Sequence, residues 1–116
     1  MGEAELREWA NGKAAGAGCA VQIASFKDGS LRDGVFILHV LLGVAPECVD
    51  AALILPGGTA EERHENAKYA VSCAHKAGCT TFMAAADIEE VQPRMILCLL
   101  AAAMSLDLKR DQISLV

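Results

Sequence analysis

Hydrophobic and polar residues are spaced at helical intervals in the first segment of the chain. Between residues 3 and 17, apolar side chains recur on one face at Leu6, Trp9, Ala10 and Ala14, while charged residues occupy the other face. This periodicity predicts an amphipathic helix with Trp9 as a core anchor. Residues 19–29 follow as a connector, with a short extended piece expected at 21–23.

The second helical pattern contains the run VFILHVLL at residues 35–42, which is apolar on nearly every face. Such a run is typical of a buried central helix. Ser30 and Asp33 are spaced as a variant of the capping box, which predicts that the helix begins at Ser30. Pro46 ends it, because the residue before a proline is disfavoured in helical conformation.

A brief helical turn at 50–54 and a Pro-Gly-Gly break at 56–58 precede the clearest helical pattern in the sequence. Thr59 is a favourable N-cap residue, and Glu62 is its capping-box partner. Small apolar residues then form one stripe at helical spacing: Ala67, Ala70, Val71, Ala74 and Ala77. Gly78 predicts the end of this helix.

A loop at 79–86 and a short turn at 87–90 lead to the last predicted helix, which runs from Pro93 to about Leu106. The helix is apolar on every face, so we predict that it is buried. Residues 109–116 are expected to form a frayed tail.

These patterns predict an all-α fold of four main helices with short connecting turns. Two helices are expected to be buried on all sides, and two amphipathic helices to cover them. No strand-like alternation continues long enough to build a sheet. We expect one domain over residues 1–116, with its core at about 4–108.

Composition narrows the choice of partners. The chain has 116 residues, of which 53% are hydrophobic and 22% charged, and its formal net charge is -5. A nucleic-acid or anionic-membrane partner requires a surplus of Lys and Arg, so we expect neither. The apolar run after residue 94 is also too short to span a bilayer.

The cysteines indicate a reducing compartment. There are five, an odd number, and no two form a C-x-x-C pair: Cys19, Cys48, Cys73, Cys79 and Cys98. A secreted disulfide framework normally has an even number. The N-terminus runs directly into charged residues and shows no signal peptide. We therefore predict a soluble cytoplasmic protein.

The sequence nominates no active site. His64 and His75 are eleven positions apart on one predicted helix, about 16 Å, which is too far for one metal ion. Both are expected to face solvent, whereas His39 is expected to be a core or interface histidine with a satisfied hydrogen bond. Residues 28–34 resemble a calcium loop, but Arg32 occupies a ligand position and helix capping is the better explanation. We predict no catalytic residue, no metal site, no cofactor and no enzymatic activity.

Four short segments resemble one known family, in the same order along the chain. They are residues 6–11 (LREWAN), 23–28 (IASFKD), 64–72 (HENAKYAVS) and 87–95 (DIEEVQPRM). Together they are similar to the last calponin-homology domain of the fimbrins (plastins). The resemblance covers nearly the whole chain, although residues 17–20 and 51–58 match that family poorly.

The resemblance implies the calponin-homology fold and a role in cross-linking actin filaments in the cytoskeleton. It places this domain as the second half of the second tandem actin-binding region, beside a neighbouring calponin-homology domain, with weak binding to F-actin on its own. In such domains the first helix is usually linked to filament contact. By that analogy Arg7, Lys13 and the nearby Lys27 are the actin-contact candidates.

Two alternatives remain at this point. The three cations are equally well explained as ordinary solvated charges. The chain also fits a stand-alone calponin-homology module that binds a regulatory, microtubule or signalling protein without touching actin. A strongly basic face would be expected of a microtubule reader, and the net charge makes that version less favourable.

Overall fold

The computed structural model describes residues 2–79 and 83–114, with side chains described as far as residue 111. Helices form the whole of the regular structure in these residues. The long ones are α1 (Glu3–Gly16), α2 (Val35–Val44), α3 (Ala60–Ala77) and α5 (Pro93–Ser114), and α4 (Ala85–Glu89) is short. Three 3₁₀ turns connect them: η1 (Gly29–Asp33), η2 (Pro46–Cys48) and η3 (Ala51–Leu53). The predicted all-α fold is confirmed.

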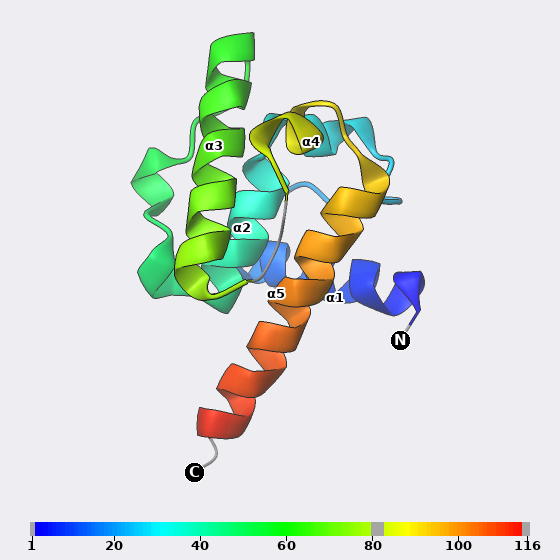
Figure 1. Cartoon of the computed structure of the whole chain (residues 1–116), viewed down its shortest axis with the longest axis vertical. Helices are drawn as coiled ribbons and strands as arrows, with labels where there is room; N and C mark the ends of the chain where they lie inside the picture. The colour runs from blue at the N-terminus through cyan, green and yellow to red at the C-terminus, as the bar shows by residue number, and fades with distance from the viewer. Residues whose placement is uncertain (1, 80–82, 115–116) are drawn as a thin grey trace.

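Helix α2 lies in the middle of the molecule, with α3 on one side and α5 and α1 on the other (Figure 1). Its burial follows from its composition, because six of its side chains are buried: Phe36, Ile37, Leu38, Val40, Leu41 and Val44. Each buried side chain of this size contributes about 1.5–3 kcal/mol of hydrophobic free energy. The prediction of a central helix is confirmed. As predicted, the ring of His39 is satisfied, with Nδ1 2.8 Å from the Val35 carbonyl oxygen.

The predicted start of this helix at Ser30 is wrong. Residues 29–33 form the 3₁₀ turn η1, and Gly34 adopts a left-handed conformation with φ of 75° before α2 begins at Val35. A side chain at this glycine would place its Cβ 2.9 Å from the Cβ of Asn66. The chain therefore bends where α3 packs closely against it. The Asp33 carboxylate still acts as a cap, because it accepts the Val35 N–H at 2.9 Å.

Asn66 is a buried polar side chain that joins three parts of the fold. Its side-chain oxygen accepts the Leu55 N–H at 2.9 Å, and its NH₂ group donates to the carbonyls of Asp33 at 2.8 Å and Leu55 at 2.9 Å. Only 1% of the residue is exposed. Asn66 thus links α3 to the segment before it and to the entry of α2.

Helix α3 begins and ends where its capping residues predicted, but the predicted capping box between Thr59 and Glu62 is only half formed. The Thr59 hydroxyl accepts the Glu62 N–H at 3.1 Å, and Gly78 ends the helix in a left-handed conformation. The Glu62 carboxylate accepts the N–H groups of Gly57 and Gly58 instead of the Thr59 N–H. The carboxylate therefore fixes the glycine turn that precedes the helix.

Replacing Thr59 with alanine is expected to lower the free energy of unfolding by about 1 kcal/mol, because the Glu62 N–H loses its capping acceptor. Urea unfolding followed by circular dichroism measures the difference. Thr59→Ser, which keeps the hydroxyl, is the control. Equal destabilisation by both substitutions would show that the hydroxyl bond does not stabilise the helix.

Helix α5 departs from the prediction in two ways. It is buried along one face only, and on the opposite side Cys98 is exposed and Leu97 and Ala101 are half-buried. It also continues to Ser114, well beyond the predicted end at Leu106, so residues 109–114 are helical. Figure 1 shows its last turns projecting from the body of the molecule. With α5 included, the molecule measures 44 × 29 × 27 Å. No helix in the described part of the chain is long and apolar enough to cross a membrane.

Close packing of α1 against α2 depends on Gly43. A Cβ at this position would lie 2.9 Å from the backbone carbonyl oxygen of Lys13, well inside van der Waals contact. The backbones of the two helices therefore approach without a side chain between them. Contacts of this kind need a residue without a Cβ.

Candidate functional site

Two of the three predicted contact residues lie on α1, and both have partners within the fold. Lys13 forms an ion pair with Asp107 of α5, with Nζ 2.9 Å from Oδ1. The other carboxylate oxygen of Asp107 accepts the indole N–H of Trp9 at 3.1 Å. Asp107 is buried, whereas Trp9 is only partly buried. Trp9 is thus not the enclosed core anchor expected from its spacing, and it packs at the core edge where its N–H reaches a carboxylate.

Arg7 lies on a different side of α1, where the helix contacts the connector. Its guanidinium donates to the carbonyl of Ala24 at 2.9 Å. One turn later, the Asn11 side chain pairs with the backbone of Ile23, accepting its N–H at 2.8 Å and donating to its carbonyl at 3.1 Å. These bonds hold the connector against α1 at Ile23 and Ala24. No strand forms at residues 21–23, and side chains of α1 fix this part of the connector instead.

The end of the connector is fixed by Asp28. Its carboxylate accepts the N–H groups of Ala24 and Ser30, each at 3.0 Å. The bond from Ala24 and then that from Ser30 lower the pKa of Asp28 below its ordinary value of 3.8. Lys27, immediately before it, is exposed, and its ammonium group has no ion-pair partner among the described residues.

The lowered pKa predicts a small stability contribution that depends on pH. The contribution is complete above pH 3.8 and is lost as the pH falls through the lower value of the folded state. Asp28→Asn keeps one of the two acceptor oxygens, so we expect it to cost about 0.5–1 kcal/mol at pH 7, since solvent screens this site. Urea unfolding at pH 7, 5 and 3 should show the two proteins converging in acid. A difference that stays constant or grows would contradict the assignment.

A groove of about 480 Å³ lies between the start of α1, the end of the connector and the first turns of α5. Its lining combines apolar and charged side chains: Glu3, Ser25, Phe26, Lys27, Pro93, Arg94 and Leu97. Arg7 lines a smaller adjoining hollow of about 250 Å³ together with Ser25 and Phe26. Lys13 lines a separate depression beside Gly43 of α2.

The fold therefore brings Lys27 and Arg7 to neighbouring hollows and leaves Lys13 elsewhere. It also adds Arg94, which the sequence analysis missed as a contact candidate. Arg94 is exposed in the first turn of α5. The available signal was its position directly after Pro93, in a segment that already carried the family resemblance.

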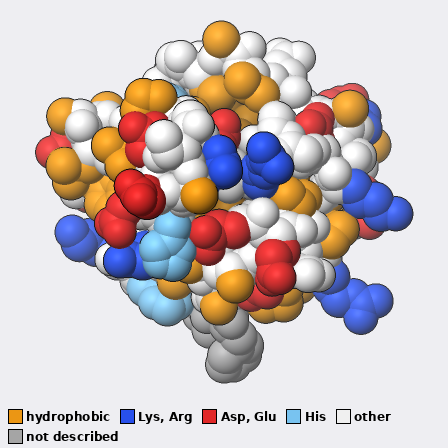
Figure 2. Space-filling model, turned by 90° about the horizontal axis from the view of Figure 1, so that it is seen from above, with side chains coloured by type: hydrophobic (Ala, Val, Ile, Leu, Met, Phe, Trp, Pro, Cys, Tyr) orange, Lys and Arg blue, Asp and Glu red, His pale blue; other side chains and the backbone are white. Residues whose placement is uncertain are grey.

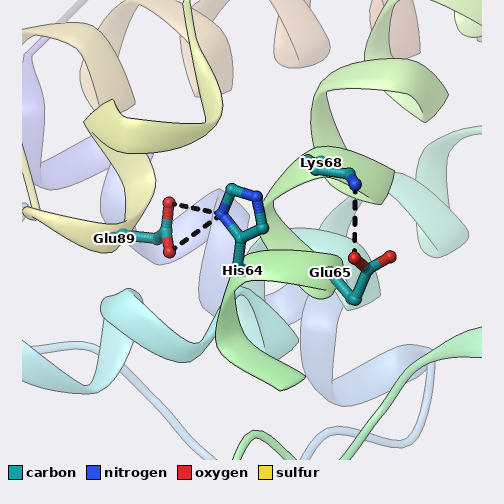
Figure 3. Close-up of polar contacts among 4 residues, drawn as sticks. All are labelled: His64, Glu65, Lys68 and Glu89. Atoms are coloured by element: carbon teal, nitrogen blue, oxygen red, sulfur yellow. Dashed lines mark hydrogen bonds and ion pairs between the residues drawn. The ribbon is translucent and has the colours of Figure 1, made fainter. Parts of the chain in front are cut away.

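Polar side chains of α3 form ion pairs within the fold. Both histidines of α3 are exposed, as predicted, and His64 pairs with Glu89 of α4, its Nδ1 lying 3.1 and 3.2 Å from the two carboxylate oxygens (Figure 3). Lys68 pairs with Glu65 on α3, at 3.2 Å. On the face seen in Figure 2, acidic, basic and hydrophobic side chains are interspersed.

The cysteines are free thiols, and those at 73 and 79 are buried. Burial raises the pKa of both thiols, so they are poor nucleophiles at neutral pH. Within the residues that the structure describes, no group of three or more His, Cys, Asp or Glu side chains is placed to hold a metal ion.

Comparison with known proteins identifies one domain family and a group of similar sequences within it. Residues 1–108 match the sequence model of the calponin homology (CH) domain. Fimbrin-2 of Arabidopsis thaliana is 44% identical over 108 residues, which cover 93% of this chain and 16% of that protein. Fimbrin of Saccharomyces cerevisiae is 39% identical over 107 residues, covering 92% and 17%. The chain thus spans about a sixth of the length of these relatives.

A solved structure extends the likeness to three dimensions. The crystal structure of the actin-crosslinking core of Schizosaccharomyces pombe fimbrin superposes with a TM-score of 0.84 at 40% sequence identity, covering 89% of this chain and 22% of that one. The residues that line the groove and those that form the Asn66 junction lie within residues 1–108, the part matched by the family. This chain belongs to the calponin homology domain family, and its fold is that of the fimbrin members.

Proposed function

We propose that this chain is an actin-binding domain of a fimbrin-type filament cross-linking protein of the cytoskeleton. The observation that carries the proposal is the match to a fimbrin actin-crosslinking core. At 40% identity, 89% of this chain superposes on a part that makes up 22% of that core. In the proposed arrangement the chain corresponds to the last CH domain and forms the second half of the second tandem pair. It acts by binding, with a neighbouring CH domain as its partner, and not by catalysis.

The contacts of Arg7, Lys13 and Lys27 indicate that these three cations are not equally available to bind a filament. Lys27 is exposed and free to meet an acidic surface. Arg7 already donates to the Ala24 carbonyl, and Lys13 is 31% exposed and paired with Asp107. The exposed positions of α1 include Glu5, Glu8 and Gly12, which add no positive charge to this helix. We therefore propose that Lys27 contributes more to filament contact than either cation of α1.

A domain exchange tests the proposed function. The corresponding domain of the Schizosaccharomyces pombe fimbrin core is replaced by residues 1–116 of this chain, and low-speed co-sedimentation measures filament bundling. We expect the chimera to bundle filaments about as well as the parent core, and a core lacking the domain to bundle less. A folded chimera that bundles filaments no better than the truncated core would contradict the proposal.

Charge reversal in the same chimera tests the role of Lys27. Lys27→Glu is expected to weaken filament affinity by about 2–5-fold, because an exposed cation gives a modest attraction at physiological salt. Lys109→Glu makes the same charge change at an exposed position of α5 and is the matched control. Equal affinities for the two variants would remove Lys27 from the contact surface.

A further inference from the structure

We propose that the groove between the connector, α1 and α5 is a docking site for an acidic peptide segment of a partner protein. The groove is formed by segments far apart in the sequence, since the end of the connector lies beside the start of α5 (Figure 1). The family assignment does not require a ligand there. The inference rests on the chemistry of the lining; it shares Lys27 with the proposal about actin, and its test uses no actin.

The floor of the groove is apolar. The ring of Phe26 is buried against the core, and the side chains of Pro93 and Leu97 remain half-exposed beside it. A volume of about 480 Å³ is within the range of natural ligand pockets and is large enough for one or two apolar side chains. An occupant with an apolar anchor residue would bury the surface that Pro93 and Leu97 leave open.

The rim of the groove is cationic although the whole chain is acidic. Lys27 and Arg94 are exposed and have no ion-pair partner in the described part of the chain. Glu3 is the anion that lines the groove with them, so the lining carries one net positive charge. Arg7 adds a further positive charge in the adjoining hollow. Charge complementarity therefore favours an occupant with carboxylates on either side of its apolar anchor.

Two other kinds of occupant fit less well. A second copy of this chain would present a surface on which, in the face seen in Figure 2, acidic side chains are interspersed with basic ones that would meet the cations of the rim. A small anion would meet the two cations but would leave the floor of Phe26, Pro93 and Leu97 uncovered. An acidic peptide segment with an apolar anchor uses both features of the groove.

Titration with a model peptide tests the inference in the absence of actin. The probe is a fluorescein-labelled twelve-residue peptide in which two leucines are flanked by glutamates. One control peptide has glutamine for every glutamate, and another has alanine for both leucines. We expect amide NMR shifts at residues 25–27 and 94–97, and an affinity at least about tenfold higher for the probe than for either control. Shifts centred elsewhere, or equal affinity for all three peptides, would overturn the inference.

Two variants with opposite expected effects make the test specific. K27E combined with R94E should weaken binding of the probe by about tenfold or more, whereas E3Q should strengthen it by about twofold to threefold. The matched control is K68E combined with K109E, which changes the net charge by the same amount away from the groove. Equal weakening by the two double variants would indicate attraction to overall charge and not docking. Because no filament is present, the result is independent of the domain-exchange experiment.

Discussion

Replacing Asn66 with leucine is expected to lower the free energy of unfolding by about 3–5 kcal/mol. Leucine has a similar volume but leaves three backbone groups without their partners, namely the Leu55 N–H and the carbonyls of Leu55 and Asp33. An unsatisfied polar group costs about 1–3 kcal/mol when it is buried. Local relaxation and partial access of water reduce the sum of the three.

Urea unfolding at pH 7, followed by circular dichroism, measures the Asn66 effect. Asn11→Leu is the matched control, because Asn11 also binds backbone N–H and carbonyl groups but does so at a partly exposed position. Water can replace its bonds, so we expect a loss of about 1 kcal/mol there. If the two substitutions destabilise the domain equally, burial is not what makes Asn66 important.

The second large effect is expected at Trp9. Replacing it with alanine should lower the free energy of unfolding by about 2–4 kcal/mol. Complete removal of a buried tryptophan typically costs about 3–5 kcal/mol, and Trp9 is only partly buried. The substitution also removes the indole N–H that Asp107 accepts. Because Asp107 itself is buried, its carboxylate then depends on Lys13 alone.

Trp9→Phe separates packing from hydrogen bonding. Phenylalanine keeps most of the apolar contact and loses the N–H, so we expect it to lower the free energy of unfolding by about 1.5–2 kcal/mol, at the lower end of the range for hydrogen bonds to charged groups. Thermal and urea unfolding of the two variants give the comparison. A Trp9→Phe protein as stable as the parent would show that Lys13 alone satisfies Asp107.

The sequence predicted best where the determinants of structure are local. Thr59 and Gly78 mark the ends of α3 through bonds within a few residues of themselves, and both ends were placed correctly. The start of α2 was misplaced because Gly34 bends against Asn66, which is 32 positions away along the chain. The open face of α5 was missed for a related reason. An apolar stretch of sequence indicates burial, but it does not show which elements of the fold will cover each face of the helix.

In the candidate site, too, local features could be predicted from the sequence and long-range contacts could not. Exposure of Lys27 follows from its polar surroundings in the connector and could be expected. The pairing of Lys13 with Asp107 joins residues from opposite ends of the chain, so periodicity gave no sign of it. The position of Arg94 after Pro93 was a signal in the sequence, but its proximity to Lys27 became visible only after the fold had placed α5 beside the connector.

Gly43 has a mechanical consequence for the proposed role in a filament cross-linking protein. The backbones of α1 and α2 meet there without an intervening side chain. A force that presses α1 toward α2 cannot be absorbed at that point by a change of rotamer, and close-packed interiors have low compressibility. A push on the first helix should therefore displace the central helix directly, so the pair would respond to compression as a single stiff element.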